Sequence, residues 1–250
     1  MMPDEHVIYI YDGTLDGFLT CVFLAFSLKE SPELISKTPD VQMQFGTRIR
    51  EIQTRKDYAD RVYKGILDKL GEGTLNMVYH GVLSAESDAE TAALDYLRLG
   101  FKYGKSIYGN LADKRIMRLS SISRSVAWER VRFMEILRFS ELEGGILLAE
   151  FEPFSHVLPI IMPHFADRLN TQPFIINDKK RRIAGVYDTA EWYLLSSDEM
   201  SLPDYSDSEA QYRSLWKLFF NSITIKQREN LKLQMQHLPK KYWKHVTEMK

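Results

Sequence analysis

The first half of the chain reads as one buried strand followed by a series of helices. The apolar, β-rich run His6–Tyr11 predicts a buried strand. The turn residues Asp12-Gly13-Thr14 follow it, and apolar residues at helical spacing then predict a helix to about Lys29, capped by Asp12. A short apolar run, Val41–Phe45, predicts one more strand. Similar spacing predicts helices over Arg55–Leu70, Leu75–Leu83 and Asp88–Gly100, and one or two basic helices over Asp113–Ser140.

The pattern changes in the second half of the chain. Gly145–Phe151 predicts a strand, and Phe154–Arg168 predicts a helix interrupted by Pro159 and Pro163. Short apolar runs separated by tight turns predict three antiparallel strands, Phe174–Asn177, Arg182–Tyr187 and Trp192–Leu195. A polar connector leads to a helical tail. The sequence therefore predicts an α+β protein that is mostly helical, with a small antiparallel or mixed sheet and a basic helical C-terminal segment.

At 250 residues the chain can form one compact α+β unit over 1–250, and a subdomain boundary near Leu142 is the alternative. No apolar run approaches the roughly 18 residues of a membrane span, and the start lacks a cationic segment followed by an apolar one. The single cysteine, Cys21, lies among apolar residues, which favours a buried thiol. We therefore expect a cytoplasmic protein that does not associate with a membrane.

Charge is unevenly distributed along the chain. Residues Arg98–Arg138 carry ten basic and three acidic side chains, hence +7. Residues Gln211–Lys250 carry nine basic and two acidic side chains, which is again +7, whereas the whole chain has a net charge of -1. Two basic segments in an otherwise acidic protein predict a positive surface, provided that the fold brings them together.

The tail also mixes aromatic rings with its cations. Trp216, Phe219 and Phe220 lie near Lys217, and Tyr242 and Trp243 lie among three lysines. Cations attract phosphates, and flat rings can stack on bases, so this composition is compatible with nucleic-acid binding. It is equally typical of an amphipathic helical tail whose rings pack in the core. We expect Pro239 to begin the last helix, with Tyr242, Val246 and Met249 on one stripe and Lys240, Lys241 and Lys244 partly outward.

Three stretches near the ends of the chain resemble a known family. They are Tyr11–Phe23 and the tail runs Trp216–Ile223 and Gln236–Lys244, with a looser match over Glu129–Phe139 around Arg132-Phe133. These segments resemble the bacterial "probable DNA metabolism protein" family. The resemblance implies a DNA-repair accessory encoded beside a radical-SAM protein that modifies or repairs DNA, and related domains look fused to domains resembling uracil-DNA glycosylases.

No motif supports a catalytic role. A strand ending in Asp-Gly-Thr-Leu resembles haloacid-dehalogenase-type phosphatases, but Ile10 occupies the position of their nucleophilic aspartate. Asp12 and Asp16 could hold a divalent cation if a third ligand came from elsewhere; the alternative is a cap and a favourable charge at a helix start. The six histidines lack the spacing of a zinc site, so we expect neither metal nor cofactor.

The sequence therefore predicts a nucleic-acid-binding accessory protein in DNA metabolism or repair, acting on DNA together with a radical-SAM partner. Two alternatives stay open: a protein-interaction subunit without direct DNA contact, and a metal-dependent nuclease or lyase that uses Asp12 and Asp16. The residues predicted to contact phosphates or stack on bases are Arg132, Arg138, Lys217, Lys226, Arg228, Lys240, Lys241, Tyr242, Trp243 and Lys244.

Overall fold

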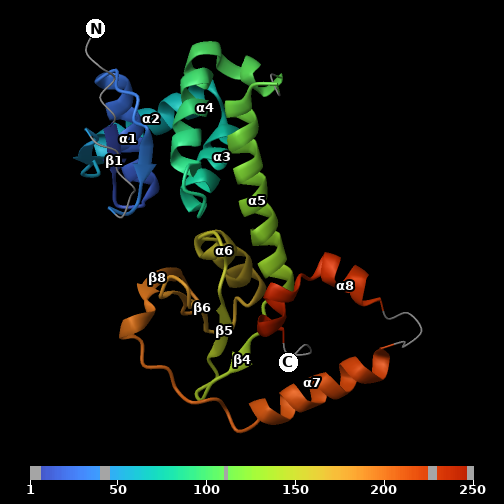
Figure 1. Ribbon diagram of the computed structural model, residues 1–250. Helices are drawn as coiled ribbons and strands as arrows, with labels where there is room; N and C mark the ends of the chain where they lie inside the picture. Colours follow the sequence, from blue (N-terminus) through green and yellow to red (C-terminus); the bar gives the residue numbers. More distant parts are fainter. Residues whose placement is uncertain (1–6, 40–45, 110–111, 225–229, 247–250) are drawn as a thin grey trace. The chain divides into compact units, whose positions relative to one another are not determined.

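A computed structural model describes residues 7–39, 46–109, 112–224 and 230–246. These residues form helices and two small sheets, which confirms the predicted α+β class (Figure 1). The chain divides into two compact units, unit 1 (Met1–Trp128) and unit 2 (Glu129–Lys250). The division falls between Trp128 and Glu129, inside the helix α5 (Lys114–Ile136), whereas the alternative boundary was expected near Leu142. That the two units form one compact body over 1–250 stays a prediction.

The sheet of unit 1 has three parallel strands. The predicted first strand is confirmed as β1 (Val7–Ile10), which is the central strand, and its Val7 and Tyr9 side chains are buried in a core that includes residues of the helices of this unit. On either side it pairs with β2 (Leu34–Ser36) and β3 (Arg48–Glu51), neither of which the pattern predicts. The expected strand Val41–Phe45 lies outside the described residues.

The helices predicted for unit 1 are confirmed, with shifts of a few residues at their ends. The polar turn before the first helix differs from the prediction, because Thr14 and not Asp12 is the N-cap: its hydroxyl accepts the Gly17 N–H at 2.9 Å. The helices of this unit are α1 (Leu15–Ser27), α2 (Lys56–Lys69), α3 (Glu72–Leu83), α4 (Ala89–Tyr103), the 3-10 helix η1 (Gly104–Gly109) and the first part of α5 (Lys114–Ile136).

The sheet of unit 2 is mixed and has five strands in the order β4-β5-β6-β7-β8. The three antiparallel strands predicted from the second half are confirmed as β6, β7 and β8, whereas β5 and β6 run parallel because a helix connects them. The strands are β4 (Ser140–Glu141), β5 (Leu147–Phe151), β6 (Phe174–Asp178), β7 (Ile183–Tyr187) and β8 (Trp192–Ser196).

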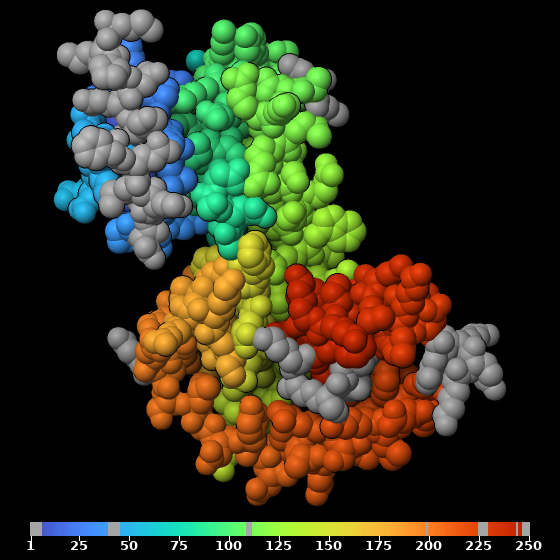
Figure 2. Space-filling model, viewed as in Figure 1, coloured from blue at the N-terminus to red at the C-terminus, as the bar shows by residue number. Residues whose placement is uncertain are grey.

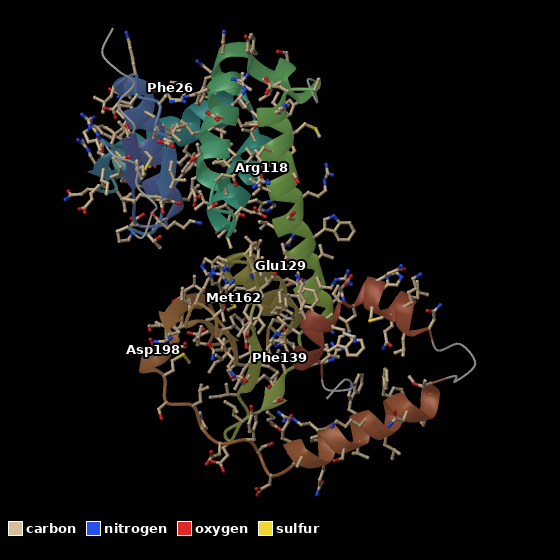
Figure 3. The ribbon with its side chains drawn as sticks, viewed as in Figure 1. Phe26, Arg118, Glu129, Phe139, Met162 and Asp198 are labelled. Atoms are coloured by element: carbon tan, nitrogen blue, oxygen red, sulfur yellow. The ribbon has the colours of Figure 1, made fainter. Side chains whose placement is uncertain are left out.

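The connecting helix α6 (Leu158–Arg168) is continuous through both prolines that were expected to interrupt it. Pro159 lies in the first turn, where a backbone N–H has no partner within the helix, so the proline costs no hydrogen bond. Met162, labelled in Figure 3, comes from this helix and lies so close to β7 that a Cβ on Gly185 would be 2.3 Å from its sulfur. A side chain at position 185 would therefore force Met162 to move from its place between α6 and the sheet.

The tail forms two helices and one short 3-10 turn. Figure 2 shows its atoms, coloured orange to red, at the surface. The elements are α7 (Glu209–Ile223), α8 (Leu231–His237) and η4 (Lys240–His245), after the short η2 (Ser197–Glu199). Pro239 begins the last element as predicted, although that element is a 3-10 helix. Of the predicted stripe, Tyr242 and Val246 are buried, and Met249 lies outside the described residues. The Tyr242 ring packs edge-on against Phe133 at 5.2 Å between centroids.

Among the described residues, no helix has both the length and the apolar character needed to cross a lipid bilayer.

Candidate functional site

Helix α7 is attached to the rest of unit 2 through its first turn. The Glu209 carboxylate accepts the Glu141 N–H at 3.0 Å and pairs with Arg213 at 2.6 Å. Arg213 also donates to the Ser140 hydroxyl at 2.6 Å and lies over the Tyr205 ring. Because these contacts join the helix to the edge strand β4, they fix where the following turn of α7 presents its side chains.

A cavity of about 320 Å³ lies between the start of α7 and the sheet of unit 2. Leu148 and Glu150 face it from β5 because alternate residues of a strand point to the same side. Glu152 and Lys179 follow the carboxyl ends of the parallel strands β5 and β6 and therefore meet at one edge of the sheet. This cavity is called the cationic pocket, and its lining is Arg138, Ser140, Leu148, Glu150, Glu152, Lys179, Tyr205, Arg213, Lys217 and His245.

The cationic pocket contains four Lys or Arg side chains and two carboxylates, so positive charge is in excess. Lys179 pairs with Glu150 at 3.5 Å, and Arg213 pairs with Glu209. Lys217 is exposed, and within the part of the chain that the structure describes it forms no ion pair. A pocket with this balance can accept an anion such as a phosphate group.

A larger and mostly apolar groove of about 720 Å³ lies on the other side of Arg138 and Arg213, which line both sites. Three of its rings are exposed: Tyr212 by 63%, Trp216 by 42% and Phe219 by 53%. This site is called the aromatic groove, and its lining is Leu137, Arg138, Phe139, Arg168, Glu209, Tyr212, Arg213, Leu215, Trp216 and Phe219.

The spacing of residues along α7 explains why the two sites are neighbours. Arg213 and Lys217 are four residues apart and therefore share one side of the helix, which borders the cationic pocket. Tyr212, Trp216 and Phe219 follow the i, i+4, i+7 pattern of an adjacent stripe, which borders the aromatic groove. One helix thus presents cations and rings side by side.

Of the predicted site residues, the structure brings Arg138 and Lys217 together in the cationic pocket. Arg132 instead donates to the backbone carbonyl of His237, at the end of α8, so its guanidinium anchors the tail. Tyr242 is only 8% exposed and packs in the core, which leaves its ring no face for stacking on a base. Trp243 is half-buried and donates its indole N–H to the Leu238 carbonyl at 2.8 Å.

The remaining predicted cations belong to the end of the tail. Lys240 and Lys241 are exposed, as predicted, and each lies over an aromatic ring of its own turn, Trp243 and Tyr242 respectively. Lys244 has its backbone in η4, but its side chain is outside the described part of the structure, and Lys226 and Arg228 lie outside the described residues altogether.

The basic segment Arg98–Arg138 is divided between the two units. In unit 1 two of its arginines pair with carboxylates: Arg115 with Asp113 at 2.7 Å, and Arg118 (Figure 3) with Asp88 at 2.6 Å. Hydrogen bonds from Arg115 lower the pKa of Asp113 to about 2, and a hydrogen bond from Arg118 lowers the pKa of Asp88. Neighbouring carboxylates neutralise these two arginines. Of the segment Arg98–Arg138, it is Arg138, at its end, that lines the cationic pocket of unit 2.

The Asp12 and Asp16 side chains have structural partners. Asp12 accepts hydrogen bonds from Thr14 and from the Thr54 hydroxyl at 2.6 Å. Partial burial opposes its ionisation, but the hydrogen bonds from Thr54 and Thr14 outweigh that effect and lower the pKa of Asp12. Asp16 pairs with Lys56 at 3.1 Å. Among the described residues no group of three or more potential metal ligands gathers, at this position or elsewhere.

Sequence reasoning missed two cations of the pocket, Lys179 and Arg213. Arg213 could have been found, because it precedes the predicted Lys217 by four residues on the same predicted helix. Lys179 could not, because the pattern marks it only as part of a turn, and its place depends on the parallel pairing of β5 with β6. The aromatic groove could be predicted in part, because Trp216 and Phe219 are among the aromatic residues of the tail.

The fold and site define an α+β protein with a cationic pocket and an adjoining aromatic groove in its second unit. The sequence profile of DUF4130, a domain of unknown function, matches residues 87–248, which is just under two thirds of the 250 residues. The chain belongs to this family. The match is compatible with the "probable DNA metabolism protein" resemblance and assigns no function. A search of the curated proteins finds no significant match.

The attachment of α7 is expected to weaken in acid. Partial burial raises the pKa of Glu209, but hydrogen bonds from the Glu141 N–H, Ser140 and Arg213 outweigh it, so its folded pKa is lowered. Its stabilising contribution is present above the unfolded value of about 4.3 and is lost as the pH falls through the lowered folded pKa. The unfolding free energy of wild type should exceed that of Glu209→Gln at pH 6, and this difference should become smaller as the pH falls to 3. A difference that stays constant would contradict this role.

Proposed function

We propose that this protein is a cytoplasmic accessory factor of DNA metabolism that binds nucleic acid through unit 2. The observation that carries the proposal is the cationic pocket, where Arg138 and Lys217, far apart in the sequence, lie with Lys179 and Arg213. Excess positive charge in a concave site supplies the salt-dependent attraction that holds a phosphate backbone. The DNA link itself comes from the family resemblance over both ends of the chain.

The same resemblance supplies a partner, a radical-SAM protein. These 250 residues contain one cysteine, Cys21, which is fully buried, and burial raises the pKa of its thiol. Cysteine-ligated iron–sulfur clusters need several thiolates, so the partner would own the cluster and its radical chemistry. The role proposed for this chain is to contact the nucleic acid and position it for the partner.

The proposal predicts that DNA binding weakens steeply with salt and that Lys217→Gln flattens the dependence. Each lost phosphate contact should lower the slope of log affinity against log salt by about 1. The measurement is fluorescence anisotropy of the full chain with labelled DNA over a range of salt concentrations. Lys64→Gln is the matched control, because Lys64 is an exposed lysine of α2 in unit 1, and its slope should equal that of wild type.

Two results would contradict the proposal. One is no binding below roughly 100 µM at low salt, where electrostatic attraction is strongest. The other is binding whose salt dependence is the same in wild type, Lys217→Gln and Lys64→Gln, since the cationic pocket would then take no part.

A second candidate, a protein-interaction subunit, is favoured by strand β8. This strand forms the edge of the sheet, and its apolar residues Trp192, Tyr193, Leu194 and Leu195 are each more than a third exposed. It contains no charge or proline, the residues that commonly protect an edge strand from pairing. Retention of the radical-SAM partner by a chain that binds no DNA would favour this candidate.

A further inference from the structure

The cationic pocket and the aromatic groove differ in chemistry but share two lining residues, Arg138 and Arg213. These two arginines separate the two sites. On one side lie Lys179 and Lys217, and on the other lie three exposed rings. A ligand that passes the two arginines meets cations and then aromatic faces within one turn of the helix.

The aromatic groove is unusual for a protein surface. Leu215, Trp216 and Phe219 are 59%, 42% and 53% exposed, and they belong to one stripe of α7. The Trp216 and Phe219 rings lie 6.0 Å apart between centroids, at an interplanar angle of 38°, so they form a tilted pair. The volume of the groove, about 720 Å³, lies in the range of about 300–1,000 Å³ that is typical of small-ligand sites.

We propose that the two sites together bind single-stranded nucleic acid, with a base in the aromatic groove and its phosphate in the cationic pocket. The inference rests on the proposed function and adds the class of nucleic acid. Each nucleotide alternates an aromatic base with an anionic phosphate, which matches the order of rings and cations on α7. Stacking on rings needs an open base face, and in a duplex both faces are covered by neighbouring pairs.

An acidic amphipathic peptide is the competing occupant, because Arg138, Arg168 and Arg213 border the groove. Two observations favour nucleic acid. The exposed lining of α7 is largely aromatic, and rings stack on every base irrespective of sequence. The cations also continue beyond the groove into a separate pocket, where Lys217 has no carboxylate partner among the described residues. A peptide helix lying in the groove would leave that pocket unused.

The test compares a labelled single-stranded oligonucleotide with a duplex of the same length, using the full chain at one low salt concentration. Wild type is expected to bind the single strand at least about tenfold more tightly. Trp216→Ala should weaken single-strand binding at least about fivefold, the lower end of what one stacked base contributes, and should change duplex binding less than twofold. Trp216→Phe, which keeps a ring, should retain most of the affinity.

Trp128→Ala is the matched control, since Trp128 is a 64% exposed tryptophan of unit 1, and it should bind as wild type does. Circular dichroism is the check that the variants fold, which is expected because Trp216 is 42% exposed. Equal binding of both nucleic acids, unaffected by Trp216→Ala, would overturn this inference and leave the proposed function standing. Binding of neither would overturn both, and capture of an acidic peptide under those conditions would assign the groove to a protein partner.

Discussion

Glu129→Ala should lower the free energy of unfolding by about 3 kcal/mol, since each hydrogen bond to a charged group contributes about 1.5 kcal/mol or more. Glu129, labelled in Figure 3, is 8% exposed, and its two carboxylate oxygens accept the N–H groups of Phe154 at 2.7 Å and Ser155 at 2.8 Å. From the other side, Arg181 donates to the Pro153 carbonyl at 3.2 Å. Side chains therefore bind both backbone N–H groups and a backbone carbonyl of the segment that connects β5 to α6.

Urea denaturation followed by circular dichroism measures this effect as a shift of the midpoint. Glu135→Ala on the same helix is the control, because the Glu135 side chain is 60% exposed and lies 4.0 Å from Arg132. An exposed ion pair of this kind contributes about 1 kcal/mol at most. If the unfolding free energies of the two variants differ by less than about 1 kcal/mol, the hydrogen bonds of Glu129 to the β5–α6 connection are not principal contacts of unit 2.

Gly17→Ala is expected to destabilise unit 1 by about 2 kcal/mol, because overpacking costs about 1–3 kcal/mol and the preference of a helix for alanine over glycine offsets part of it. A Cβ at this position would lie 2.1 Å from an Asp12 carboxylate oxygen and 2.9 Å from the Thr54 hydroxyl. Relief requires Asp12 to move, which breaks its hydrogen bonds with Thr14 and Thr54. Glycine at position 17, in the first turn of α1, therefore leaves room for the Asp12 carboxylate and its hydrogen bonds.

Gly73→Ala gives the matched control for that experiment. Gly73 lies in the first turns of α3, and a Cβ added there would meet nothing within 4 Å. Alanine in a helix is more favourable than glycine by roughly 0.5–1 kcal/mol, so this variant should be as stable as wild type or slightly more stable. The same urea titration measures both, and equal stability of Gly17→Ala and Gly73→Ala would contradict the packing account.

Much of the fold follows from local patterns. Helix α2 and strands β5 to β8 were predicted because their apolar residues repeat at the spacing of one element, and the tail stripe of Tyr242 and Val246 is buried for the same reason. Strand β3 was missed because its sequence, Arg-Ile-Arg-Glu, is polar and largely exposed. It is a strand because it pairs in register with β1, which no local pattern reveals.

The candidate site was predictable only in part, for a related reason. Residue type identified Arg138 and Lys217 as candidate cations, but their meeting in one pocket depends on how Glu209 and Arg213 attach α7 to β4. The same limit applies to Tyr242, whose ring suggests stacking by composition and is instead packed against Phe133. Residue type predicts which chemistry is available, whereas tertiary contacts decide which side chains face a ligand.

The most direct test is ultraviolet crosslinking of the full chain to single-stranded DNA, with the crosslinked peptides located by mass spectrometry. We expect crosslinks to peptides of α7 (Glu209–Ile223), where Tyr212, Trp216 and Phe219 are exposed, and we expect these crosslinks to be lost in high salt. Crosslinks confined to residues of unit 1, or crosslinks to α7 that persist in high salt, would contradict this expectation.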